Sequence, residues 1–369
     1  MGWPAKFASL WADAGQAHAQ CGRTRLAQVM DLLNLALSPA RLGPGDYYSY
    51  RLFESGLSAK QKQEFVGWRR ESVLDALNKP DWHCLGLDKV LMAALMAEQG
   101  LACPVTRAIY LKGRIRRIGQ AQALRSDAEL QAWLRDPTHY PFFGKPSASG
   151  FGRGAVFAQS YDAANDVVRL RSGAGIAVVE FSEHRHDREQ LGYLFQTPLT
   201  TDPRLQPALG ELPTSLRMMV LYDEVEGPLV HRVFWKLPVG HNMNDNFNDG
   251  VTGNLAAGLD VESGRIIRVV NGSGLRLREV RQHPDTGVDL LTLAVPDWTH
   301  VQTFVKQLAL LFPQLRFQQW DIALTSQGPV ALELNLFGTG GCELSQVLER
   351  RGLVDATMQR FLRRHGLLH

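Results

Sequence analysis

The sequence lacks any long apolar run. No stretch approaches the ~18 uninterrupted apolar residues that a membrane-spanning helix needs, so we expect no membrane span. The N-terminal stretch also lacks the compact apolar core of a signal peptide, because Lys6, Asp13 and later arginines interrupt it. A myristoylation motif would need Ser or Thr at position 6, where this chain has Lys6. We therefore expect a cytoplasmic protein.

The sequence also contains few cysteines and carries little net charge. The four cysteines have no metal-ligand or disulfide-framework spacing, so reduced thiols are the simplest interpretation. The 40 Lys and Arg residues balance 37 Asp and Glu residues, and the resulting charge of +3 does not predict a nucleic-acid partner. A chain of 369 residues is too long for one small core, so two or three packed subdomains are expected.

Residues 1–103 have the pattern of a mostly helical region. One predicted helix lies between Arg23 and Pro39, and its apolar stripe consists of Leu26, Met30, Leu33 and Leu37. A second is capped by Ser58, with a stripe formed by Phe65, Trp68, Val73 and Leu77. A third ends at Gly100, a typical helix C-terminal residue. We interpret these stripes as core packing.

From Pro104 the pattern changes to short strands separated by glycine and Asn-Asp turns. Longer strands follow after about residue 212, and a helix with a hairpin closes the chain. The strands look antiparallel, so the fold class is α+β. We divide the chain into a helical region, 1–103, a small subdomain, 104–196, and a C-terminal subdomain, 197–369.

A glycine-rich turn joins two apolar strands in the segment KPSASGFGRGAV, residues 145–156. Glycine lets backbone N–H groups point at phosphate oxygens without steric cost, and the loop contains Gly150, Gly152 and Gly154. Lys145 before the loop and Arg153 inside it place two positive charges beside the same phosphates. The segment is not a P-loop, because no Gly-Lys-Ser/Thr follows and a strand rather than a helix comes next.

The hairpin WDIALTSQGPVALELN, residues 320–335, carries three oxygen ligands at its strand ends. Mg²⁺ prefers such ligands, so Asp321, Glu333 and Asn335 are candidates for a metal site, with solvated strand ends as the alternative. Glu333 and Asn335 are two apart and share a strand face. A five-residue connection over 325–329 places Asp321 opposite Glu333, whereas a four-residue one turns it away. We predict the five-residue connection.

Together these features resemble a known family. A lysine before a glycine-rich hairpin, a later strand arginine, an aspartate and a closing E-x-N follow the order of ATP-grasp enzymes. More specifically, the chain resembles the bacterial sugar-transfer-associated ATP-grasp family. The resemblance covers most of the chain, and includes RLGPGDYYSYRLF, YPFFGKPSASGFGRG, GYLFQTPL, DNFNDGVTGNLAAGLDVESG and FPQLRFQQWDIALTSQGPVALELN. It implies an ATP-grasp fold of two α+β subdomains that clasp ATP, preceded by the helical region.

The resemblance also implies roles for individual residues. Lys145 matches the lysine at the ATP α- and β-phosphates, and Arg217 resembles the strand arginine that faces the phosphates or an acyl-phosphate. Together with Arg153 they would supply catalytic charge. The other predicted nucleotide contacts are Lys89, the loop residues Ser149, Gly150, Gly152 and Gly154, the GYLFQT residues Phe195 and Gln196, and Lys236, Asp245 and Asn246, which would wall the site. In GYLFQT, backbone groups would read adenine and the Gln196 side chain would meet the ribose. Asp321, Glu333 and Asn335 match the family's Mg²⁺ ligands.

The implied activity is an ATP-dependent ligase. A carboxylate would attack the γ-phosphate to give an acyl-phosphate, and an amine or other nucleophile would displace phosphate, with ATP and Mg²⁺ as cofactors. The substrates would be small molecules in polysaccharide or natural-product biosynthesis, without nucleic acid, and a homodimer is a further option. Two alternatives stay open, namely an ATP-grasp small-molecule kinase and a non-catalytic ATP-binding protein.

Overall fold

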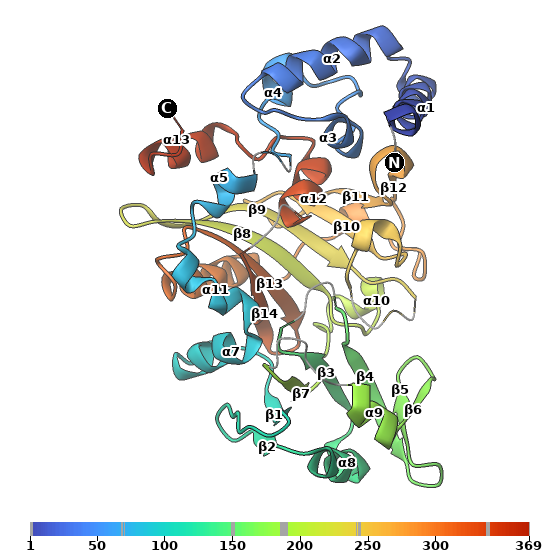
Figure 1. Cartoon of the computed structure of the whole chain (residues 1–369), viewed down its shortest axis with the longest axis vertical. Helices are drawn as coiled ribbons and strands as arrows, with labels where there is room; N and C mark the ends of the chain where they lie inside the picture. Colours follow the sequence, from blue (N-terminus) through green and yellow to red (C-terminus); the bar gives the residue numbers. More distant parts are fainter. Residues whose placement is uncertain are drawn as a thin grey trace.

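The computed structural model describes residues 3–67, 69, 71–148, 152–184, 191–240, 242, 245–336 and 340–368. Figure 1 shows two β-sheets, with the helices of residues 3–62 at one end of the molecule and the smaller sheet at the other. Within the described part of the chain, no helix combines the length and apolar character needed to cross a bilayer.

The smaller sheet has the strand order β2-β1-β7-β3-β4-β5-β6. Its strands are β1 (Thr106–Tyr110), β2 (Gln122–Leu124), β3 (Phe142–Pro146), β4 (Val156–Asp162), β5 (Val167–Leu170), β6 (Gly175–Ala177) and β7 (Tyr193–Gln196). Helices α8 (Asp127–Arg135) and α9 (Val178–His184) contribute to the core under this sheet. All described strand pairs are antiparallel except β1 with β2, which is parallel and departs from the sequence expectation.

The larger sheet has the strand order β12-β11-β10-β9-β8-β13-β14. Its strands are β8 (Ser215–Asp223), β9 (Gly227–Leu237), β10 (Leu255–Leu259), β11 (Ile266–Asn271), β12 (Arg278–Glu279), β13 (Phe317–Thr325) and β14 (Gly328–Asn335). The main core lies between one face of this sheet and α11 (Trp298–Leu310), and it includes the buried Trp235 and Trp320. The other face packs against α12 (Gly340–Glu349) and α13 (Ala356–Arg364). The short α10 (Gln206–Leu209) precedes β8.

The N-terminal region is helical, as the sequence predicts. Its helices are α1 (Trp3–Cys21), α2 (Arg25–Leu37), α3 (Pro44–Ser49), α4 (Ala59–Lys62), α5 (Glu71–Asp75), α6 (Cys84–Leu87) and α7 (Lys89–Glu98). Short 3₁₀ turns complete the described helical structure over Pro80–Trp82, Pro137–His139, Asn248–Gly250, Gly274–Arg276 and Leu290–Thr292. The predicted end of α7 is confirmed, because Gly100 follows it with a φ of +66°. Leu85, Met92 and Met96 join the core of the larger sheet, so α6 and α7 pack with that sheet.

The predicted single helix after Ser58 is wrong. Ser58 does cap α4, since its hydroxyl accepts the Gln61 N–H, but that helix ends at Lys62. The chain then runs through residues 63–67 without helical structure, and α5 begins at Glu71. A Cβ at Gly67 would lie only 2.5 Å from the Asp46 side chain, so the backbone here passes directly against α3. Of the predicted stripe, Phe65 and Leu77 are buried, whereas Trp68 lies outside the described residues.

The core prediction for α2 is also wrong. Leu26, Met30, Leu33 and Leu37 are all exposed, although their spacing is that of a buried helix face. The inward face of α2 instead carries Gln28 and Leu35, which are both almost completely buried. Periodicity identified the apolar stripe correctly but could not show that polar contacts turn the opposite face inward.

The 320–335 hairpin has the predicted pairing but a different connection. Asp321 lies opposite Glu333, which confirms the expected register. However, Thr325 pairs with Gly328, so only two residues form the turn and the five-residue connection is wrong. Counting back from that turn, a regular ladder would place Asp321 opposite Leu332. A β-bulge between Asp321 and Ile322 adds one residue on β14 and restores the Glu333 pairing.

Candidate functional site

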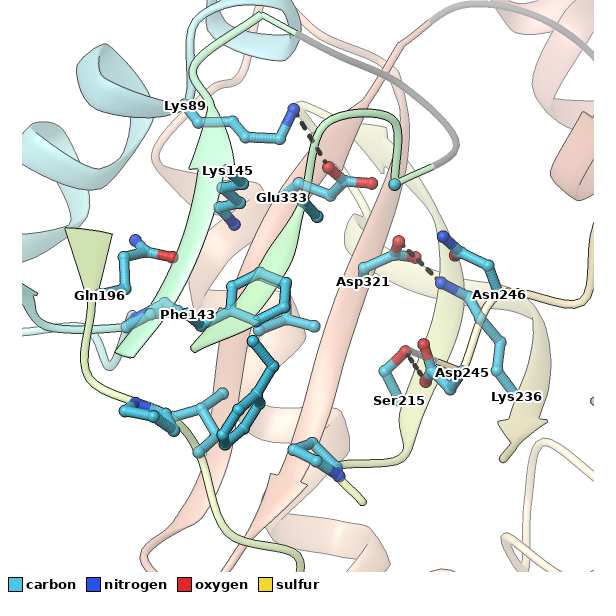
Figure 2. Close-up of a pocket in the computed structure, with 18 of the residues that line it drawn as sticks. Lys89, Phe143, Lys145, Gln196, Ser215, Lys236, Asp245, Asn246, Asp321 and Glu333 are labelled. Carbon is cyan, nitrogen blue, oxygen red and sulfur yellow. Dashed lines mark hydrogen bonds and ion pairs between the residues drawn. The ribbon is translucent and has the colours of Figure 1, made fainter. Parts of the chain in front are cut away.

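A cavity lies between the two sheets and is lined by residues from both (Figure 2). Its polar wall carries three lysines and three carboxylates, namely Lys89, Lys145, Lys236, Asp245, Asp321 and Glu333. Its apolar wall includes Phe143, Phe157, Pro198, Leu199 and Leu332. One cavity therefore offers an apolar surface beside a dense group of charges, as a ligand with an aromatic base and phosphates would require.

Lys145 enters this cavity from β3 on the smaller sheet. Burial, together with the nearby Lys89 ammonium, lowers the pKa of Lys145 to about 8. The preceding residue is Gly144, where a Cβ would lie 2.7 Å from the Tyr193 ring. The Tyr193 hydroxyl donates to the carbonyl oxygen of Gly154 at 2.9 Å. Gly144 therefore makes room for a tyrosine that ties the far end of the glycine-rich turn to β7.

Lys89 begins α7 and faces Glu333 across the cavity. The Lys89 Nζ lies 3.3 Å from Glu333 Oε2. The preceding Asp88 caps α7 through the Val90 and Leu91 N–H groups and also accepts the Ser147 hydroxyl at 2.8 Å. Ser147 follows β3, so this contact fixes the start of α7 beside the strand that carries Lys145. The two lysines thus approach the same cavity from elements that are tied together.

Asp321 on β13 is held by two cations. The Arg217 guanidinium donates to both carboxylate oxygens of Asp321, and Lys236 Nζ donates to Oδ2 at 2.9 Å. The strand register explains this arrangement, since Asp321 lies opposite Arg217 on β8. Burial alone would raise the pKa of Asp321, but the Arg217 and Lys236 charges hold it well below its usual range. Asp321 therefore stays charged in the cavity wall.

Asp245 forms another part of the wall. The Ser215 hydroxyl donates to Asp245 Oδ2 at 2.5 Å, and burial raises the pKa of Asp245. Asn246 and Lys236 line the cavity beside it, as Figure 2 shows. The structure thus brings the three residues predicted to wall the site, Lys236, Asp245 and Asn246, together with the predicted Lys89, Lys145 and Gln196.

Several predicted site residues do not line the cavity. Arg217 is not part of the cavity lining but contacts the lining residue Asp321. Asn335 lies farther along β14, opposite Gln319. The Phe195 side chain is fully buried in the core of the smaller sheet, with its ring centroid 4.6 Å from that of Trp133, so only its backbone could face a ligand.

The glycine-rich turn is described only in part. Gly152 lines the cavity, whereas Arg153 and Gly154 do not, and all three residues are exposed. The predicted Ser149 and Gly150 lie outside the described residues.

Sequence reasoning missed the apolar wall. Phe143 precedes Lys145 by two residues on β3, so both side chains leave the same face of that strand. This alternation was a usable signal. Leu332, by contrast, reaches the cavity beside the bulge in β14, and no residue pattern announces that bulge.

The proposed metal ligands have the chemistry that Mg²⁺ requires. Asp321 and Glu333 are adjacent carboxylates on paired strands and both line the cavity. Among the described residues, the buried Asn335 Nδ2 has no hydrogen-bond partner, so no contact from that nitrogen ties the amide elsewhere. Carboxylate and amide oxygens suit a hard divalent cation. In the structure, the cations Arg217, Lys236 and Lys89 balance the carboxylate charge.

A separate carboxylate and histidine cluster lies away from this cavity. In the described part of the chain, Asp223, Glu224 and His365 bring potential ligand atoms within 4.8 Å of one another. Both carboxylates are engaged by arginines, because Arg364 contacts Asp223 at 3.1 Å and Arg316 contacts Glu224 at 2.9 Å. These contacts link α13 to the β8–β9 turn and explain the cluster as a structural one.

Comparisons with solved structures give remote similarities. Phosphoribosylamine–glycine ligase from Thermotoga maritima is 12% identical, with a TM-score of 0.43 over 80% of this chain and 60% of that one. Biotin carboxylase from Campylobacter jejuni is 12% identical, with a TM-score of 0.42 over 76% and 46%. L-amino acid ligase from Bacillus licheniformis is 12% identical, with a TM-score of 0.38 over 85% and 52%. The chain thus spans less than two thirds of each of these proteins, and these low scores carry no functional argument.

The family comparison is decisive. No curated protein matches the chain in sequence. The sequence profile described as sugar-transfer associated ATP-grasp matches residues 69–360, which is most of the chain and includes both sheets. The two sheets and the lysines and carboxylates of the cavity all lie within the matched residues. The chain belongs to the sugar-transfer associated ATP-grasp family.

Proposed function

We propose that this protein is an ATP-dependent ligase. It would join a small-molecule carboxylate to an amine or another nucleophile through an acyl-phosphate, releasing ADP and phosphate, in polysaccharide or natural-product biosynthesis. The observation that carries this proposal is the position of Lys145 on one sheet facing Asp321 and Glu333 on the other, within one cavity. Such an arrangement suits a triphosphate that lies between cations and a metal bridging to carboxylates.

The apolar wall would receive the adenine base. Phe143 comes from the smaller sheet and Leu332 from the larger one, so a flat base could lie between them. Gln196 lines the same part of the cavity at the end of β7, where its amide would meet a polar edge of the nucleotide. The triphosphate would then extend toward Lys89 and Lys145. We further propose that the two halves of this clasp correspond to residues 104–196 and 197–369.

The charged wall would stabilise the transferring phosphoryl group. Asp321 and Glu333 in the cavity wall, with Asn335 two residues beyond Glu333 on the same strand face, would hold Mg²⁺. The ion would supply positive charge beside the phosphate oxygens. Lys145 would donate ammonium hydrogen bonds to the phosphate oxygens on which negative charge develops. Fixed donors of this kind lower the activation barrier because they need not reorganise during the reaction. Arg217 and Lys236 would keep Asp321 ionised and oriented, since both already contact its carboxylate.

The substrates would meet at the polar end of the cavity. Asp245 and Asn246 form its wall there, beside Lys236. Lys236 would attract a carboxylate substrate to the γ-phosphate, and the glycine-rich turn near Gly152 would cover the phosphates and exclude water from the acyl-phosphate. This mechanism requires no covalent nucleophile on the protein.

Mass spectrometry of a metabolite pool tests the proposal. The protein is incubated with the pool, ATP and Mg²⁺, beside the Glu333→Ala variant. We expect wild type to form a product equal to two metabolites less water, with ADP and phosphate, and we expect the variant to lose this product. A Glu262→Ala variant changes an exposed carboxylate outside the cavity and should behave as wild type. A metabolite that gains only a phosphoryl group would identify a kinase and contradict the ligase.

A further inference from the structure

The outward surface of α2 is apolar. We define the α2 outer face as Leu26, Val29, Met30, Leu33 and Leu37, all of which are exposed. Leu26 is 74% exposed and Leu37 is 87% exposed, so the face is open along the whole helix. The other exposed residues between these two leucines are Asn34 and Ala36, which carry no charge. Five large apolar side chains on one uncharged helix face are unusual for a surface that meets only water.

The orientation of α2 is fixed by contacts on its opposite side. The buried Gln28 donates to the carbonyl oxygens of Ala14 and Arg23 and accepts the Tyr48 hydroxyl at 3.0 Å. Asp31 accepts the Tyr47 hydroxyl at 2.8 Å and an ammonium hydrogen bond from Lys62. Rotating α2 to bury its leucines would break these partly buried hydrogen bonds. The apolar face is therefore held outward by the fold.

Aromatic side chains of α1 extend this surface. Phe7 and Trp11 are exposed and stack on each other, with ring centroids 6.3 Å apart. The Arg25 guanidinium lies 4.2 Å from the Trp11 ring centroid, which places the aromatic pair beside the N-terminal end of α2. Figure 1 shows α1 and α2 at the outer end of the molecule, away from the smaller sheet. A partner could therefore cover this surface without obstructing the cavity.

We propose that the α2 outer face pairs with the same face of a second copy of this chain. Leu26, Met30, Leu33 and Leu37 are separated by four, three and four residues, which is the spacing of a two-helix apolar seam. Antiparallel pairing about a two-fold axis near the middle of α2 places Leu26 beside Leu37 of the second copy. It also places Met30 beside Leu33 of the second copy, so the seam is self-complementary.

Charge complementarity and interface size both favour a second copy of this chain as the partner. Antiparallel pairing brings Arg25 of each copy to the C-terminal end of the other α2, which has no basic residue in its last turn. A cation at that end complements the helix dipole. A specific interface covers roughly 800 Å² on each partner, and Phe7, Leu10 and Trp11 of α1 enlarge the seam toward that size.

A membrane-bound helix would instead carry several lysines or arginines along its flanks, and the outward positions from Leu26 to Leu37 carry none.

Sedimentation velocity of the full-length chain tests this proposal. We expect wild type at micromolar concentration to sediment as a particle of twice the chain mass of 41.1 kDa. Leu33→Glu places two glutamates near the two-fold axis and is expected to give the monomer. Leu310→Glu is the matched control, because Leu310 is also a helical leucine and both are 53% exposed. The control should remain a dimer, and both variants should keep the wild-type far-ultraviolet circular dichroism spectrum, which shows that they fold.

Two results would overturn the proposal. One is a wild-type chain that stays monomeric at all concentrations. If that monomer co-sediments with vesicles of phosphatidylcholine and phosphatidylglycerol, the α2 outer face binds a membrane surface instead of a second copy. The other is a dimer that persists in Leu33→Glu, because a different surface would then form it. Neither result depends on the proposed ligase activity, since the readout is mass alone.

Discussion

Replacing Lys145 with methionine is expected to lower the rate of ATP consumption at least about a hundredfold. Lys145 lines the cavity between the sheets and is the predicted phosphate ligand on β3. Methionine has a similar length but cannot donate to a phosphate oxygen, so the loss falls on the transition state and on nucleotide binding. The effect is measured as ADP released per enzyme and as ADP affinity by calorimetry.

A surface lysine provides the control for this variant. Lys112 is exposed and pairs with Asp127 at 2.6 Å, outside the cavity. Lys112→Met should keep wild-type turnover. The variant Lys145→Met should not be less stable than wild type at pH 7. In the folded wild type the pKa of Lys145 lies below the unfolded value of about 10.4, so the fold disfavours the charged form, and methionine removes that charge. Equal turnover in both variants would show that Lys145 does not contact the phosphates.

The same lysine sets a pH dependence of nucleotide binding. Burial lowers the pKa of Lys145 to about 8, so the ligand-free lysine loses its proton as the pH rises through that value. Bound phosphates favour the ammonium and raise this pKa, so binding near pH 8.5 should take up a proton and ADP affinity should fall with rising pH. Calorimetry in two buffers of different ionisation enthalpy measures this uptake, which Lys145→Met should abolish.

Replacing Arg232 with methionine is expected to lower the free energy of unfolding by about 3–5 kcal/mol. Arg232 on β9 is almost completely buried. It pairs with Glu349 at 3.4 Å and Asp355 at 2.9 Å, and it donates to the carbonyl oxygen of Gly352. These partners lie at the end of α12 and at the cap of α13, so the loss of Arg232 leaves both carboxylates with the half-exposed Arg351 as their remaining arginine partner. Urea unfolding followed by tryptophan fluorescence measures the change.

Two further variants separate this network from an ordinary ion pair. Arg316 forms a surface pair with Glu224, and Arg316→Met should cost less than about 1 kcal/mol. Adding Glu349→Leu to Arg232→Met should recover part of the stability, because it removes one of the two buried carboxylates that lost their buried cation. If Arg232→Met costs no more than Arg316→Met, the buried network does not hold α12 and α13 to the sheet.

The residue pattern predicted the strand pairing of the hairpin better than its turn. Oxygen ligands at the ends of 320–335 correctly indicated that Asp321 and Glu333 face one another. The connection was predicted wrongly, because a two-residue turn and a bulge together give the same pairing as a longer turn. Hydrogen bonds of the backbone determine a bulge, and no side-chain pattern in this hairpin reveals it.

The sequence could not give the orientation of α2, whereas alternation along the strand could have placed the ring of Phe195. The apolar stripe of α2 has core spacing, but the hydrogen bonds of Gln28 and Asp31, which come from residues distant in sequence, decide which face is buried. Phe195 precedes the cavity residue Gln196, so alternation along β7 turns its ring to the opposite face of the sheet and into the core. Long-range contacts therefore determine which face of α2 is buried, and strand geometry determines where the Phe195 ring lies.

Trapping of the acyl-phosphate with hydroxylamine tests the central claim most directly. The protein is incubated with ATP, Mg²⁺, hydroxylamine and a panel of small carboxylic acids, and hydroxamates are detected by mass spectrometry. We predict ADP release together with the hydroxamate of at least one acid in wild type, and neither in Glu333→Ala. Phosphorylated alcohols without any hydroxamate, or no difference between wild type and the variant, would contradict an ATP-dependent ligase.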